Sequence, residues 1–251
     1  LKGPYLNSEY IGIFLDSKNP AIKSKKIRKA LNIGFDRKLM VAFLRNNVGY
    51  PAKKGFIPKG LPGTSNEEIE YDPKLAKKLV GDYIKETGEW PTLKLATDSN
   101  YLDLCEYLQR EFQKIGIKIK IDVMPTASLR KAKSSGKLDL FRASWIADYP
   151  DAENYLSLFN SSNFSPNGPN YTHYKNLKFD KMYKNSLEII SDTLRFEKYR
   201  QMDSIAFSDF PIVPLYYDQV VRFVQKSIEG MEINPINLLV LKNVKKSGVK
   251  N

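Results

Sequence analysis

The sequence predicts an α/β fold, and three observations support this class. Between residues 92 and 123, a strand, an amphipathic helix and a second strand follow one another closely. Such a βαβ unit implies a parallel strand pair joined by a right-handed crossover. Hydrophobic residues are 42% and aromatic residues 12% of the 251-residue chain, which is enough to bury a core. Further strand and helix patterns lie on both sides without an internal repeat, so we expect one α/β domain with a few additional terminal strands.

The first part of the chain predicts one strand, two helices and a long loop. The apolar run 10–16 is typical of a strand. Ser24 is placed to cap a first helix, and Asp36 a second. Three large residues are expected on the apolar side of this second helix: Leu39, Met40 and Phe43. Glycine and proline then recur through residues 50–70, which indicates an irregular segment of a length that is often functional.

The middle of the chain contains the βαβ unit and the helix before it. Asp72 followed by Pro73 is a strong helix start, and Gly88 marks the end of this helix. The strand 92–97, a helix from 102 to 115 and the strand 117–123 follow. Cys105 falls on the apolar side of its helix, so we interpret it as a small core residue rather than a nucleophile.

The last part predicts alternating helices and strands around a second long loop at 161–174. Asp151 is expected to cap a helix that runs through Phe159. The other expected elements are helices at 127–134, 179–190 and 194–207, and strands at 138–144, 212–217, 220–224 and 238–241.

The charge of the chain is strongly positive. Forty Lys+Arg against 28 Asp+Glu give a formal charge of +12, which is compatible with a nucleic-acid or anionic-surface binder. The lysines are spread along the chain, however, and several alternate with apolar residues, as in 117–121. This alternation favours the solvated side of strands over a phosphate-binding stripe. A nucleic-acid partner is therefore not expected, although it remains the alternative function.

The rarest residues exclude several kinds of chemistry. A single cysteine and a single histidine rule out an internal disulfide framework and any Cys-rich or multi-His metal site, so we expect neither metal nor cofactor. Serine or cysteine nucleophilic catalysis would have to pass through His173 alone. Gly55 and Gly60 have the spacing of a phosphate-binding loop, but Leu61-Pro62 replaces its Lys-Ser/Thr. We therefore expect a protein that is not an enzyme.

The segment 142–151 contains the candidate ligand-binding residues. Asp148 and Tyr149 follow a predicted strand that ends near Trp145, and sites in α/β folds concentrate where strands end. A carboxylate beside an aromatic side chain can bind an ammonium group. Arg142 could offer a guanidinium fork to a carboxylate.

Two other interpretations of this segment stay open. In the structural one, Trp145 belongs to the core, Asp148 caps a turn and Arg142 lies on the surface. In the other, Asp148 and Asp151 form the carboxylate pair of a hydrolase, at the roughly 5 to 10 Å that such pairs use.

Five motifs in order resemble those of a known family. They are IRKALNIGFDR at 27–37, YDPKLAKKL at 71–79, WIADYPD at 145–151, Phe179-Asp180, and PIVPLYY at 211–217. In this order they resemble the bacterial extracellular solute-binding proteins of family 5, the peptide-binding components of ABC importers.

This resemblance implies a fold and a division of the chain. The fold would be the C-terminal lobe of a type II periplasmic-binding-protein clamshell, with a mixed sheet flanked by helices. Residues 1–15 would be a hinge strand from a missing N-terminal lobe, 16–212 the ligand-binding lobe, and 213–251 a hinge strand and tail returning to that lobe. Family members are about twice this length, so the chain resembles a truncated protein.

The resemblance also implies roles for the candidate residues. Asp148 would receive the α-ammonium of a peptide, Trp145 would line a side-chain pocket, and Arg142 would meet a ligand carboxylate. Ala152 departs from the family pattern, which often has proline at this position. The family also carries nickel complexes, sugars and other solutes, so the implied ligand is a peptide or another small solute.

The expected setting follows from the same resemblance. We expect a monomer that works with an ABC permease and binds no nucleic acid. Its location would be periplasmic or extracellular, with a lipoprotein anchor as an option.

Overall fold

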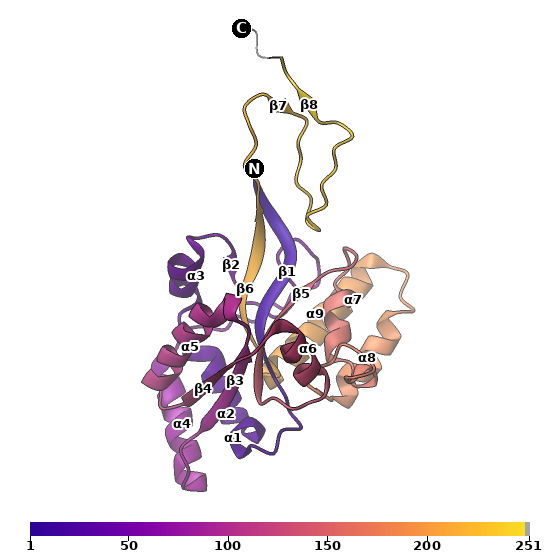
Figure 1. Ribbon diagram of the computed structural model, residues 1–251. Helices are drawn as coiled ribbons and strands as arrows, with labels where there is room; N and C mark the ends of the chain where they lie inside the picture. Colours follow the sequence, from indigo (N-terminus) through magenta and orange to yellow (C-terminus); the bar gives the residue numbers. More distant parts are fainter. Residues whose placement is uncertain (249–251) are drawn as a thin grey trace.

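The computed structural model describes residues 1–248, which form a six-stranded mixed sheet with helices on both faces. The strand order is β2-β6-β1-β5-β3-β4. β1 runs antiparallel to both β5 and β6, whereas β3 runs parallel to β4 and β5. The predicted βαβ unit is confirmed by the parallel β3–β4 pair. A separate two-stranded sheet, β7-β8, lies beyond the end of β1 and β6 (Figure 1).

The main sheet contains β1 (Lys2–Ile13), β2 (Tyr50–Pro51), β3 (Thr92–Thr97), β4 (Lys118–Val123), β5 (Leu140–Ile146) and β6 (Ile212–Val221). The small sheet pairs β7 (Ile228–Glu229) with β8 (Lys245–Lys246). The α-helices are α1 (Pro20–Lys23), α2 (Lys25–Ile33), α3 (Arg37–Arg45), α4 (Pro73–Thr87), α5 (Leu102–Lys114), α6 (Thr126–Ser134), α7 (Glu153–Leu156), α8 (Leu177–Ser186) and α9 (Asp192–Asp209). Three short 3-10 helices are η1 (Ser99–Tyr101), η2 (Ser157–Phe159) and η3 (Ser161–Asn163).

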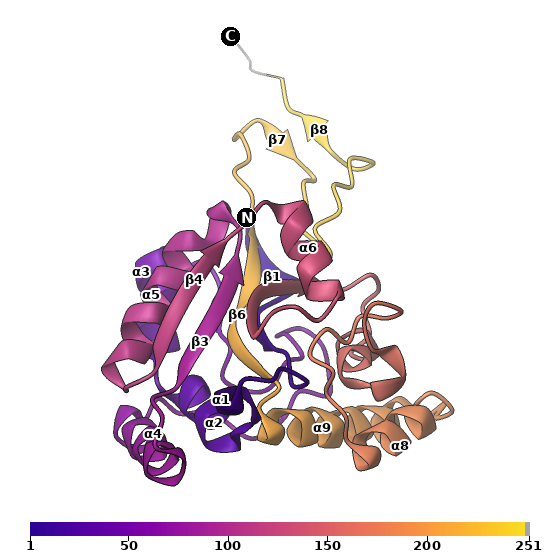
Figure 2. The same ribbon diagram turned by 60° about the horizontal axis from the view of Figure 1, so that its bottom comes forward.

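The sheet separates two hydrophobic cores. The first core lies beneath α2 to α5 and includes Ile11, Ile13, Leu95, Cys105, Phe112 and Leu215. The second core lies beneath α7 to α9 and includes Leu6, Tyr10, Phe56, Phe141, Tyr155 and Phe179. Figure 2 shows α3, α4 and α5 beside β3 and β4, with α8 and α9 at the opposite side. Because successive strand residues point to opposite faces, each long strand contributes to both cores.

Three predicted helix starts are confirmed, two of them by capping hydrogen bonds. The Asp36 carboxylate accepts from the backbone N–H of Lys38 at 2.8 Å. The Asp72 carboxylate accepts from the N–H of Leu75 at 2.9 Å, and Pro73 begins α4. Ser24 is the residue before α2, although its side chain makes no capping hydrogen bond. Gly88 ends α4 in the left-handed conformation, with φ +74°.

The ends of the sheet differ from the sequence prediction. The first strand begins at Lys2 rather than at residue 10, because its polar first half pairs with β6. The two strands expected at 212–217 and 220–224 form the single strand β6, whose pairing with β1 contains two register shifts. These irregularities take up extra residues without ending the strand. Residues 238–241 form no strand and remain exposed, so that prediction is wrong.

Two helix predictions also need correction. Leu39 and Phe43 are 56% and 73% exposed, whereas α3 buries Met40 and Val41. The helix lies at the edge of the domain, so only one narrow side of it meets the core. The helix expected from Asp151 through Phe159 is a single α-helical turn followed by η2.

The long loop 52–70 is held by a buried carboxylate on α9. Asp203 is 1% exposed and accepts hydrogen bonds from the backbone N–H groups of Phe56, at 3.0 Å, and Ser65, at 2.9 Å. Burial raises the pKa of Asp203 to about 7, against the effect of the backbone hydrogen bonds, which favour the charged form. Gly55, at φ +94°, passes so close to the carboxylate that a β-carbon would collide with it. The loop is therefore a fixed part of the second core.

We expect Asp203→Ala to lower the free energy of unfolding by about 2 to 5 kcal/mol, since each buried N–H that loses its acceptor costs about 1–3 kcal/mol. The loss should depend on pH. The folded pKa is raised from 3.8 to about 7, so the folded state binds an extra proton between these values. The stability that this proton adds to the folded state is fully present below the unfolded pKa of 3.8. It is lost as the pH rises through the folded pKa of about 7.

Urea titration of both proteins at about pH 4 and about pH 8 measures this difference. The difference in free energy of unfolding between the wild type and Asp203→Ala should be larger at the lower pH. Asp122→Ala, on the exposed side of β4, is the control and should show no such dependence. A gap that stays constant or widens with pH would contradict the assignment.

Candidate ligand site at the end of strand β5

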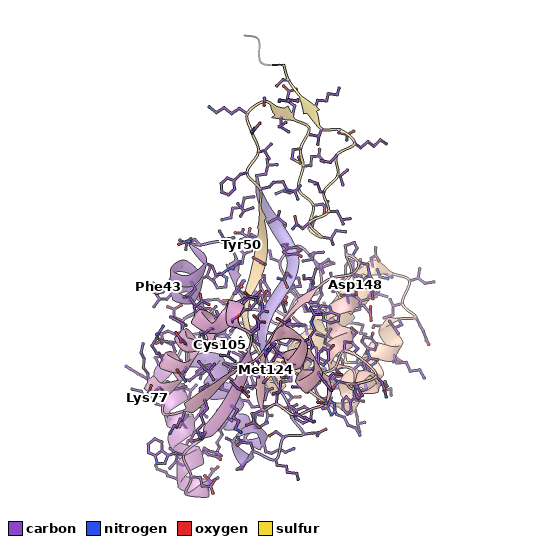
Figure 3. All side chains as sticks on the ribbon, viewed as in Figure 1. Phe43, Tyr50, Lys77, Cys105, Met124 and Asp148 are labelled. Carbon is purple, nitrogen blue, oxygen red and sulfur yellow. The ribbon has the colours of Figure 1, made fainter. Side chains whose placement is uncertain are left out.

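The candidate residues lie where β5 leaves the sheet. β5 ends at Ile146, and a turn of residues 147–152 connects it to α7. Figure 3 places Asp148 beside α7, away from Cys105 and Met124 in the middle of the domain. The turn belongs to the exposed rim of the second core, as expected for a site at a strand end.

One backbone carbonyl on β1 fixes both ends of this turn. The carbonyl of Leu6 accepts from the backbone N–H of Ala147 at 2.9 Å and from the hydroxyl of Tyr155 at 2.7 Å. Tyr155 is fully buried, and Leu6 is among the most buried side chains of the second core. The two hydrogen bonds therefore tie the start of the turn and α7 to the same point of the sheet.

Trp145 forms the wall of the site on the side of the second core. Its ring is partly buried against that core, and its indole N–H donates to Oδ1 of Asn154 at 2.7 Å. Asn154 is 5% exposed on α7. The interpretation of Trp145 as a purely internal residue is therefore too simple, because its side chain is only partly buried. Asn154 was missed by sequence reasoning, and no local pattern marks it.

Asp148 is the available carboxylate of the turn. It is exposed, and it accepts no hydrogen bond from the residues that the structure describes, so it does not cap the turn. Asp151 is occupied: its carboxylate accepts from the N–H of Glu153 at 2.8 Å and lies 3.4 Å from Nη2 of Arg195. Tyr149 is also exposed, and its hydroxyl donates to the carboxylate of Glu153. Asp148 is thus the carboxylate of this turn that stays exposed and has no partner among the described residues.

Arg142 lies on the other face of β5 from Trp145. Leu140 packs into the first core and Phe141 into the second, so alternation places Arg142 with the first. Arg142 is 8% exposed, which contradicts the interpretation of it as a surface residue. Its guanidinium group forms an ion pair with Glu9 of β1 and lies over the ring of Tyr101.

Glu9 was missed by sequence reasoning, although a signal existed. Glu9 is in phase with Ile11 and Ile13, so it faces the first core from β1. Burial raises the pKa of its carboxyl group, while Arg142 acts in the opposite direction. The predicted strand started at residue 10 and therefore did not include Glu9, whose carboxylate faces the first core.

The lone histidine lies in a hydrogen-bonded loop, and the lone cysteine lies in the first core. His173 Nδ1 lies 2.9 Å from the Asp16 carboxylate, and its Nε2 lies 3.2 Å from Ser165 Oγ. This order resembles a Ser-His-Asp arrangement, but Ser165 is 5% exposed and its own carbonyl oxygen also lies 3.1 Å from Nε2. Cys105 is fully buried, as expected, and burial raises its pKa to about 11.

Two general properties complete the site description. Within residues 1–248, no group of three or more His, Cys, Asp and Glu side chains is arranged to hold a metal ion. None of the helices described is both long enough and apolar enough to span a bilayer.

We expect Asn154→Ala to lower the free energy of unfolding by about 1–3 kcal/mol, because the indole N–H of Trp145 then loses its buried acceptor. The tryptophan emission should also change, since the ring is no longer held. Asn185→Ala on the exposed side of α8 is the matched control. Equal stability and emission of the two variants would show that the hydrogen bond does not hold the ring.

The sequence matches a family model over most of its length. The model of bacterial extracellular solute-binding proteins, family 5 (middle region), matches residues 2–167. The periplasmic oligopeptide-binding protein OppA of Salmonella typhimurium is 27% identical over 258 aligned positions, which cover 96% of this chain and 45% of the relative. Heme-binding protein A of Haemophilus influenzae is 28% identical over 240 positions, 92% of this chain and 43% of the relative.

Solved structures share the fold. HbpA2 from Haemophilus parasuis superposes with a TM-score of 0.86 at 23% identity, covering 98% of this chain and 49% of that protein. The oligopeptide-binding protein AppA from Bacillus subtilis, solved with a nonapeptide, gives a TM-score of 0.79 at 23% identity, covering 99% of this chain and 52% of that protein. The fold is therefore that of a type II periplasmic binding protein, and the chain spans about half the length of the relatives it matches.

The family model covers well over half of the chain, and the fold agrees with it. The chain belongs to the bacterial extracellular solute-binding proteins of family 5.

Proposed function

We propose that this chain is the ligand-binding lobe of the substrate-binding component of an ABC importer, and that it captures peptides without chemically changing them. The observation that carries this proposal is the exposed Asp148 carboxylate, which has no partner among residues 1–248 and lies in the turn that follows Trp145 and contains Tyr149. The peptide's α-ammonium would bind Asp148, and the aromatic rings would add cation–π contact. Peptide-binding relatives support this choice over the heme binder, since heme has no ammonium group.

The protein's second lobe would supply the missing half of the binding site. β1 and β6 leave the domain side by side (Figure 1), and the carbonyl of Leu1 accepts from the N–H of Arg222 at 3.0 Å. Two adjacent strands are suited to act as a hinge. We propose residues 1–15 and 213–251 as the connections to that lobe and 16–212 as the ligand-binding lobe, with the inner parts of β1 and β6 completing the sheet of this lobe.

Closure of the two lobes would strengthen the contact with Asp148. In water, a carboxylate and an ammonium at 4 Å attract each other by only about 1 kcal/mol, and exclusion of solvent increases this several-fold. The fixed position of the turn, set by the two hydrogen bonds to Leu6, limits the ordering that binding requires. Asp148 can therefore act as an anchor for the ligand's amino end.

The cellular setting of this proposal follows from the family. The protein would work as a monomer in the periplasm or at the outer side of the cell membrane, where a lipid anchor can hold it, and would deliver its ligand to an ABC permease. The burial of Ser165, beside His173, and of Cys105 is consistent with binding without reaction.

We expect Asp148→Ala to weaken peptide binding by about 2 to 5 kcal/mol, the usual cost of removing one partner of a buried charge pair. Calorimetry on the protein with all of its natural flanking sequence measures this. Acetylation of the peptide's amino terminus should cause a similar loss in the wild type and little further loss in the variant.

Glu106→Ala provides the control, since Glu106 is exposed on α5 and lies outside the turn. It should bind peptides like the wild type. Unchanged affinity in Asp148→Ala would remove the proposed role of this carboxylate.

A further inference from the structure

We propose that helix α8 and its connection to α9 form a docking surface for an anionic lipid membrane. This α8–α9 surface consists of six exposed residues: Lys178, Lys181, Lys184, Leu187, Ile190 and Leu194. It would take anionic headgroups together with the acyl chains beneath them. The inference goes beyond the proposed peptide capture and does not depend on it, because no residue of the turn 147–152 takes part.

The first support is a group of exposed apolar side chains at the end of α8. Leu187 is 60%, Ile190 96% and Leu194 62% exposed. Helix α8 ends at Ser186 and α9 begins at Asp192, so Ile190 lies in the connection itself. Figure 2 shows this connection at the outer side of the domain, away from β7 and β8. Single exposed apolar residues are normal on a protein surface, whereas several of them in one short segment, rimmed by polar residues, mark an interaction site.

The second support is the row of lysines on α8 that leads to this segment. Lys178, Lys181 and Lys184 follow one another at intervals of three residues and are all exposed, whereas Phe179 and Tyr183 of the same helix pack into the second core. Residues three apart are neighbours on a helix surface. Within residues 1–248, none of the three lysines forms an ion pair, so their charges are available to a partner.

The acidic residues nearby do not compensate this positive charge. Two of them are paired within α9: Asp192 with Arg195 at 2.8 Å, and Glu197 with Arg200. The Asp180 carboxylate accepts from the backbone N–H of Ser161 at 2.9 Å, on the side of η3. Glu188 is exposed beside the apolar segment, but Lys175, just before α8, adds a further exposed cation. Four lysines therefore face two acidic residues, and the surface attracts anions.

The combination of apolar and basic groups selects a lipid membrane as the partner. A nucleic acid would bind the lysines but would leave the apolar side chains in water. At a membrane interface, lysines contact the headgroups while apolar side chains enter the acyl boundary, about 5–10 Å deep. An anionic bilayer therefore offers a suitable environment to both groups at once, and contact with it would orient the lobe on the membrane.

Co-sedimentation with lipid vesicles tests this inference, using the protein with its natural flanking sequence but without an attached lipid. One set of vesicles contains phosphatidylcholine alone, and the other also contains about 30% phosphatidylglycerol. We expect the wild type to bind the anionic vesicles at least about tenfold more tightly than the neutral ones, and to bind them less tightly as the salt concentration rises.

Two double variants separate the contributions of the surface. Lys181→Gln/Lys184→Gln should weaken binding to the anionic vesicles by about tenfold, because each lysine near an anionic surface adds to the attraction. Ile190→Ser/Leu194→Ser should cause a loss of about the same size, because the apolar side chains no longer enter the acyl boundary. All four residues are exposed, so the fold should be kept, and circular dichroism of each variant verifies this.

Each double variant has a matched control on another part of the surface. Lys77→Gln/Lys78→Gln removes two exposed lysines from α4 and changes the net charge by the same amount. Leu39→Ser/Phe43→Ser removes two exposed apolar side chains from α3. Figure 3 places Lys77 and Phe43 on the side of the domain opposite to α8. Both controls should bind the anionic vesicles like the wild type.

Three results would overturn the inference. Failure of the wild type to bind anionic vesicles at low salt would exclude the membrane and would leave the α8–α9 surface to a protein partner. Equal losses from the lysine pair of α8 and the lysine pair of α4 would show that the net charge, and not this surface, drives binding. Wild-type binding by folded Ile190→Ser/Leu194→Ser would show that the apolar side chains do not enter the bilayer.

Discussion

The rest of this structure depends on the pairing of β1 with two strands at once. β1 is antiparallel to β5 on one side and to β6 on the other, so residues from opposite ends of the sequence meet along one strand. Its buried polar groups must find partners inside the fold, since an unsatisfied group there costs about 1–3 kcal/mol. The carbonyl of Leu6 accepts hydrogen bonds from the N–H of Ala147 and the hydroxyl of Tyr155. The carboxylate of Glu9 forms an ion pair with Arg142. The site turn and the buried ion pair are therefore both consequences of where β1 lies.

The same strand explains why the two faces of β5 differ in their surroundings. Trp145 faces the second core and borders an open turn, whereas Arg142 faces the first core and meets Glu9. They are three positions apart in the sequence, and in a strand this spacing places side chains on opposite faces. Proximity in sequence therefore misleads about proximity in the site. The pairing partner on β1, rather than the local motif, decides what each side chain of β5 can contact.

Much of the fold could be predicted from the sequence, because its signals are local. The alternation of 117–123, the cap at Asp72 and the apolar side of α5 each depend on residues within a few positions of one another. The failures concern distant partners. The extension of β1 to Lys2 and the continuity of β6 depend on pairing across more than 200 residues, and the exposure of Phe43 depends on where α3 lies in the domain. Among the candidate residues, Asp148 was named from the sequence. Glu9 was missed although its phase with Ile11 and Ile13 was a signal, and Asn154 had no local signal.

Net charge is a poor guide to what this protein binds. The chain carries +12, which would favour anionic partners if the charge acted as a whole. At the end of β5, however, the exposed group without a counter-ion among the described residues is the carboxylate of Asp148, and Asp151 already holds Arg195. Screening at physiological salt limits the range of surface charges to about 8 Å. The lysines elsewhere therefore contribute little to the electrostatic potential at this turn. The local arrangement at the end of β5 combines one exposed carboxylate, without a counter-ion among the described residues, with one arginine that is paired to Glu9. The charge of the candidate site is therefore set by this arrangement and differs in sign from the net charge of the chain.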